Sequence, residues 1–80
     1  MSKMKKYEVA KALKLKSEEA RRSGLAKPDG EQRSHLLHTQ LYHAATAFQL
    51  WSDSDKGGDL DAMNEFTNNL EEAADAFAQR

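Results

Sequence analysis

Residues 60–78, LDAMNEFTNNLEEAADAFA, decide the fold class of this chain. Apolar residues recur in this stretch at spacings of three and four, which draws one stripe along a helix. The residues of this stripe are Met63, Phe66, Leu70, Ala73, Ala74 and Phe77. Gly57 and Gly58 interrupt the chain just before the stretch, and Asp59 is placed to cap the first turn. The pattern predicts an amphipathic helix over these residues, with acidic side chains on its opposite side.

A second helix is predicted to begin near residue 30 and to end near residue 52. It follows the turn signature KPDG at residues 27–30, in which Asp29 has the capping-box spacing to Gln32. Its apolar residues cover nearly half of the circumference: Leu36, Leu37, Leu41, Ala44, Ala45, Ala47, Phe48 and Trp51. Residues 34–52 contain no Asp, Glu, Lys or Arg, although an exposed helix face is normally charged. We expect this helix to be central between the other segments, or to turn its second face to another chain.

The pattern of the first 27 residues is less regular. One straight amphipathic helix explains it poorly, because its apolar residues point to different sides: Val9, Leu13 and Ala20 share one side, and Met4, Tyr7 and Leu15 do not. A break near residues 14–17, with Ser17 capping a second short helix that ends at Gly24, agrees better. The chain is predicted to be a single small all-α domain of three helices, residues 1–80. A basic segment (1–27) precedes an antiparallel helical hairpin (28–80).

The charges of the chain are sorted by position. Residues 1–27 carry nine Lys or Arg and three acids, a net charge of about +6, whereas residues 28–80 carry ten acids and three bases, about −7. This asymmetry indicates that the two parts attract each other or that a charged partner binds. If the basic segment docks on the rest of the chain, Tyr7, Val9 and Leu13 should be buried.

The composition limits the classes of protein to consider. There is no cysteine, so neither disulfides nor thiolate metal sites can stabilise the small core, and oligomerisation or a partner becomes the expected source of extra stability. No apolar run approaches the roughly 20 residues that span a bilayer. We expect a soluble, cytoplasmic protein.

Sites for metals, cofactors and catalysis find little support. His35, His38 and Glu31 share a helix face but lack a fourth metal ligand. The loop at residues 53–61 alternates acids as a calcium loop does, but it departs from that pattern at two ligand positions. No activated nucleophile or glycine-rich phosphate loop is present. We expect a protein that is not an enzyme, with no catalytic residues, no metal and no cofactor.

Docking onto another protein is the predicted function. The uncharged side of the second helix and the acidic side of the third are the two candidate surfaces. Their candidate residues are His35, His38, Tyr42, Gln49, Asp61, Glu65, Glu72 and Asp75. The partner is a second copy or a different protein, and the role expected is regulatory, as in accessory or inhibitor proteins of phages and mobile elements.

The alternative function is nucleic-acid binding by the basic segment. It would act through phosphate contacts made by Lys3, Lys5, Lys6, Lys11, Lys14, Arg21 and Arg22. A helix-turn-helix motif at residues 9–23 is incomplete, because Lys14 stands where glycine is usual in the turn. In addition, Glu18 and Glu19 would open the recognition helix with charges that repel phosphate.

Overall fold

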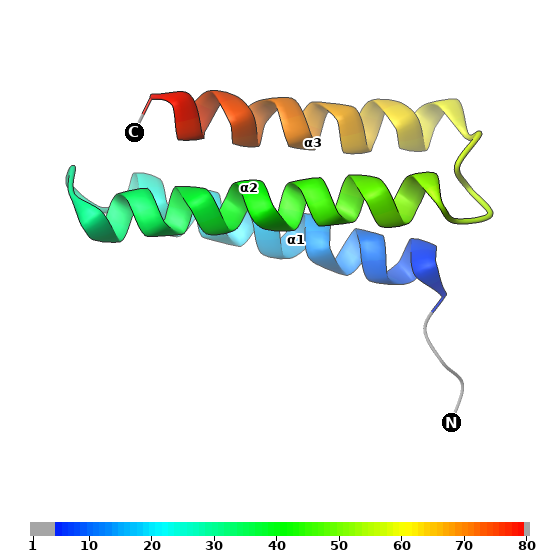
Figure 1. The fold of residues 1–80 in the computed structure, drawn as a ribbon, viewed down its shortest axis with the longest axis horizontal. Helices are drawn as coiled ribbons and strands as arrows, with labels where there is room; N and C mark the ends of the chain where they lie inside the picture. The colour runs from blue at the N-terminus through cyan, green and yellow to red at the C-terminus, as the bar shows by residue number, and fades with distance from the viewer. Residues whose placement is uncertain (1–4, 80) are drawn as a thin grey trace.

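The fold is an all-α arrangement of three helices, seen in a computed structural model that describes residues 5–79. The helices are α1 (Lys6–Leu25), α2 (Glu31–Ser52) and α3 (Leu60–Ala78), and the described residues contain no strand. Figure 1 shows α2 antiparallel to α3 beside it, with α1 crossing behind α2. The predicted fold class and the hairpin of the second and third helices are confirmed. The second helix is central, as its uncharged sequence indicated.

The predicted break in the first helix is not found, because α1 is continuous. Ser17, expected to be a cap, is fully buried, and Asn69 Nδ2 of α3 donates a hydrogen bond to its Oγ at 3.4 Å. The buried residues of α1 are all small: Ala10, Ser17, Ala20 and Gly24. A Cβ atom at Gly24 would lie 3.1 Å from Leu37 Cδ2, so small residues let α1 approach α2 closely. Serine and glycine serve packing here rather than helix ends.

The two later helices begin in different ways. Asp59 caps α3 as predicted, its Oδ1 accepting a hydrogen bond from the Ala62 backbone N–H at 2.9 Å. The capping box predicted for Asp29 and Gln32 is wrong, since Gly30 is the N-cap of α2 and no side chain caps that helix. Gly30 has a φ of 148°, which residues with a side chain rarely adopt. Asp29 therefore lies one residue before the cap position.

The core lies where α1 and α3 begin and α2 ends. Its buried cluster is Ala10, Ala47, Trp51, Ala62 and Phe66. The Trp51 and Phe66 rings stack with centroids 5.7 Å apart, and the Tyr7 ring meets Phe66 edge-on at 6.2 Å. Tyr7 and Leu13 pack against this cluster, and Tyr7, Val9 and Leu13 are half-buried rather than buried. The basic segment is therefore docked on the rest of the chain.

Three polar side chains are buried among the helices. Ser17, Gln40 and Asn69 are all at least nine-tenths buried, one from each helix. Among the described residues, the only hydrogen bond between these three joins Asn69 to Ser17. Gln40 Oε1 and Asn69 Oδ1 are buried without a partner. Unpaired buried atoms cost stability, whereas the bond between Asn69 and Ser17 favours the helix register in which these two residues meet.

Replacing Gly57 with alanine is expected to lower the free energy of unfolding by about 1–3 kcal/mol, because the new methyl group overpacks the loop. A Cβ atom at Gly57 would lie 2.5 Å from the Ser52 carbonyl oxygen. Gly58 is the matched control, since a Cβ atom there meets nothing within 4 Å. Urea unfolding of both variants checks this. Equal stabilities of Gly57→Ala and Gly58→Ala would contradict the prediction.

Candidate functional site

Ion pairs between α1 and α3 neutralise part of the charge separation within the chain. Lys14 Nζ lies 3.1 Å from Glu65 Oε1, and Arg21 Nη1 lies 3.3 Å from Glu72 Oε2. These side chains are partly exposed, so each pair contributes only about 0–1 kcal/mol and orients the helices more than it stabilises them. Two of the four carboxylates predicted to meet a partner are therefore engaged by α1.

The remaining acids of α3 stay in solvent. Asp61, Glu71 and Asp75 are exposed, and none has an ion pair among the described residues. Residues 34–79 carry eight acids and a single base, Lys56. The α2–α3 hairpin is therefore acidic even after its two pairs with α1 are counted.

The predicted residues of α2 lie on its solvent side. His35, His38, Tyr42 and Gln49 are all exposed, and the exposed fraction of Tyr42 is 65%. His35, Tyr42 and Gln49 are spaced by sevens and form one strip. His38 lies at the edge of this strip, where its ring is 5.6 Å from that of Phe77 in α3. The strip and the acids of α3 are separate surfaces.

A further surface, here called the outer face, lies between α2 and α3 on the side away from α1. It consists of Leu41, Ala45 and Phe48 from α2 and Met63, Leu70 and Ala74 from α3. Successive residues of a helix are rotated by about 100° around its axis. On α3, the residues of the outer face therefore lie roughly 150° around the axis from Glu65, Asn69 and Glu72, which contact α1. Figure 1 shows α1 behind α2 and no described helix in front of α2 and α3.

The residues of the outer face are only partly covered. Met63 is 38% exposed, Ala45 and Ala74 are exposed, and Leu41, Phe48 and Leu70 are half-buried. None of the six is charged. The sequence placed them all in the apolar arcs of the two helices, and it missed that this edge stays open. The width of the apolar arc of α2 was the feature that could have indicated this open edge, because the arc is wider than contact with one neighbouring helix requires.

The basic residues of the alternative function are divided by the fold. Lys14 and Arg21 are held in the ion pairs with α3, whereas Lys5, Lys6, Lys11 and Arg22 are exposed. Lys3 lies outside the described residues. The exposed acids Glu8 and Glu19 lie on the same helix as the free bases. The positive surface available to phosphates is smaller than the sequence indicated.

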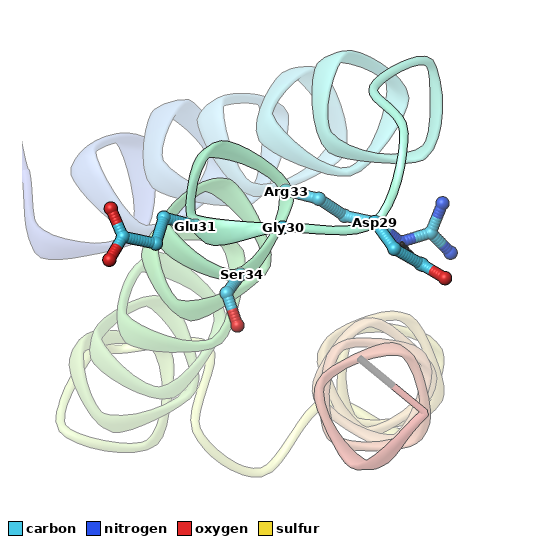
Figure 2. A pocket seen from close by; sticks show the side chains of 5 residues that line it. All are labelled: Asp29, Gly30, Glu31, Arg33 and Ser34. Carbon is cyan, nitrogen blue, oxygen red and sulfur yellow. Dashed lines mark ion pairs between the residues drawn. The ribbon is translucent and has the colours of Figure 1, made fainter.

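A cavity of about 580 Å³ lies at the start of α2, lined by Asp29, Gly30, Glu31, Arg33 and Ser34. Figure 2 shows the Glu31 side chain on the opposite side of the helix from Arg33 and Asp29, with Ser34 pointing away from all three. Arg33 Nε lies 3.7 Å from Asp29 Oδ1, and Arg33 Nη1 donates to the Lys27 carbonyl at 3.3 Å. The polar groups of this cavity do not converge on one point, as those of a ligand site do.

No group of three His, Cys, Asp or Glu side chains within residues 5–79 is arranged to hold a metal ion. Within the same part of the chain, no helix combines the length and hydropathy needed to cross a bilayer.

Comparison with protein families, with curated proteins and with solved structures finds no match to this chain. The surfaces of the molecule itself are therefore the basis for proposing a function.

Proposed function

We propose that this protein is not an enzyme but a binding protein, which docks onto another protein through the outer face. The observation that carries this proposal is an uncharged, partly apolar surface shared by two helices and left uncovered by the rest of the described chain. Exposed helix faces are normally charged, and contiguous apolar patches mark interaction sites. Tyr, Phe and Met are enriched at interfaces, and Tyr42, Phe48 and Met63 lie on or beside this surface.

The acidic side of α3 acts in this proposal as a border rather than as the main contact. Glu65 and Glu72 already pair with α1. Glu71 is exposed at the edge of the outer face, whereas Asp75 is exposed on the side of α3 nearer to Glu72. Charges at the rim of an interface affect the rate of association and the choice of partner more than the affinity.

A protein partner is favoured over a nucleic acid because the outer face belongs to the acidic part of the chain. The eight acids of residues 34–79 would repel phosphates, and two of the seven basic candidates are paired. A regulatory or accessory role in the cytoplasm, in the manner of small phage or mobile-element proteins, belongs to the same proposal.

Photo-crosslinking in the native host tests this function. Benzoylphenylalanine placed at Met63 on the outer face is expected to yield a discrete protein adduct, whereas the same probe at Leu15 is not. Leu15 is the matched control because it is a large, exposed apolar residue (60%) on α1. The adduct should be lost when Ala74→Lys is added and kept with Ala12→Lys, which adds the same charge at an exposed alanine of α1. The absence of any adduct from position 63, or equal adducts from both positions, would contradict the proposal.

A further inference from the structure

We propose that the segment bound by the outer face is a cationic amphipathic α-helix of a protein partner. This inference rests on the proposed function and goes beyond it, because it states the chemistry of the partner. Three features of the described residues support it: the shape of the α2–α3 surface, the charge around that surface, and the way in which α1 already binds α3.

The shape of the outer face suits another helix. The ring contacts His38–Phe77 and Trp51–Phe66 set the antiparallel register of α2 and α3. In this register Ala45 lies level with Leu70, and Leu41 lies level with Ala74, so small and large residues alternate along the surface. Alternation of this kind offers ridges and grooves into which the side chains of a packed helix fit.

The charge around the outer face selects a basic helix. Glu71 borders the surface on α3, and Asp53 and Asp55 lie in the loop at one end of it, all of them exposed. Lys56 is the only base in residues 34–79. A helix with lysines or arginines beside its apolar stripe would bury that stripe and place its charges near these carboxylates. An acidic helix would meet like charges.

The α1 helix shows this mode of binding within the chain. It is a basic helix that buries small residues and pairs Lys14 and Arg21 with Glu65 and Glu72 on one edge of α3. Toward the outer face, α3 presents Glu71, which has no ion pair among the described residues. A partner helix on the outer face would repeat on this side what α1 does on the first edge.

A second copy of this chain fits the outer face less well than a basic helix does. Its own outer face has the same acidic border, so face-to-face association would bring carboxylates together. The basic segment of that copy is already packed on its own hairpin, with Lys14 and Arg21 held in ion pairs. Like charges across an interface disfavour association, so the partner is a different protein.

A titration with designed peptides tests the inference on the full chain. The probe is a labelled Leu/Lys amphipathic peptide of about 18 residues, long enough to form a helix when bound. One control peptide replaces every Lys with Glu, and a second has the Leu/Lys composition in scrambled order. Fluorescence anisotropy gives the dissociation constant of each peptide. Measuring it at about 0.05 M and 0.15 M salt varies the screening of the charges between peptide and protein. The amphipathic Leu/Lys peptide is expected to bind at least about tenfold more tightly than either control.

Matched variants locate the binding. Ala74→Lys puts a like charge in the middle of the outer face and is expected to weaken binding of the Leu/Lys peptide about tenfold or more, whereas Ala12→Lys changes it by less than about twofold. Glu71→Lys is expected to weaken it about two- to fivefold, as for one exposed charge pair, and Glu8→Lys on α1 to leave it nearly unchanged. All four positions are exposed, and circular dichroism checks that each variant is folded.

Three outcomes would overturn the inference: equal binding of the Leu/Lys and Leu/Glu peptides, equal weakening by Ala12→Lys and Ala74→Lys, or a dimer of the chain alone that Ala74→Lys dissociates. These outcomes are distinguishable from failure of the proposed function. If the crosslink from position 63 persists while the Leu/Lys peptide does not bind, only the chemistry assigned to the partner is wrong. If that crosslink is absent, docking through the outer face is itself wrong.

Discussion

Replacing Phe66 with alanine is expected to lower the free energy of unfolding by about 3–5 kcal/mol. The Phe66 side chain is fully buried and contacts the rings of Trp51 and Tyr7. The substitution thus removes the contact that joins all three helices at one end of the core. A domain of this size has a total stability of about 4–12 kcal/mol, so the substitution removes a large part of the free energy that keeps the chain folded.

Urea unfolding, followed by circular dichroism and by the fluorescence of the single Trp51, measures this loss. Met63→Ala is the matched control, because Met63 lies on the same helix and is 38% exposed. Its expected cost is below about 1 kcal/mol, since a partly exposed side chain leaves little cavity behind. A loss below about 1 kcal/mol for Phe66→Ala would contradict the described core.

Replacing Gln40 with methionine is expected to raise the free energy of unfolding by about 1–3 kcal/mol. Gln40 is 1% exposed, and its Oε1 atom is buried without a hydrogen-bond partner. Methionine has a similar length and shape and fills irregular core space without a polar atom that needs a partner. Removing the unpaired oxygen therefore removes a desolvation cost while the packing is kept.

The control for this gain is Gln49→Met, an exposed position on the same helix, where the change should stay within about 0.5 kcal/mol. Thermal and urea unfolding of the two variants gives the comparison. Destabilisation by Gln40→Met would show that Gln40 Oε1 is satisfied in solution and that this buried amide contributes to stability.

The buried pair Ser17 and Asn69 explains how a core of small residues can define one arrangement of helices. Alanines and glycines pack closely but can slide past one another in several registers. The hydrogen bond from Asn69 to Ser17 favours the register in which these two residues meet. In the same register Lys14 lies opposite Glu65 and Arg21 lies opposite Glu72.

Local sequence signals predicted much of the fold. The stripe in residues 60–78 and the cap at Asp59 define α3 as the structure has it. The absence of charge in residues 34–52 predicted the central place of α2. The errors concern residues with two roles: Ser17 and Gly24 are typical of helix ends, but here they are small residues at a close helix contact.

The candidate site was only partly predictable, because it depends on how the helices pack. The exposed strip of His35, Tyr42 and Gln49 follows from their spacing. Met63 and Ala74 were assigned to the apolar stripe, and periodicity alone could not show that α1 covers only the other edge of α3. The ion pairs between α1 and α3 could have been predicted from spacing. Lys14 and Arg21 are seven residues apart, as are Glu65 and Glu72.

The most direct test of the central claim is to map where the Leu/Lys peptide binds on the isotope-labelled full chain, using amide chemical shifts. The outer face as a docking surface predicts the largest shift changes at Ala45, Met63 and Ala74, and little change at Leu15 and Arg22 on α1. Changes concentrated on α1, or spread evenly over the acids of the loop and α3 with none at Ala45, would contradict it.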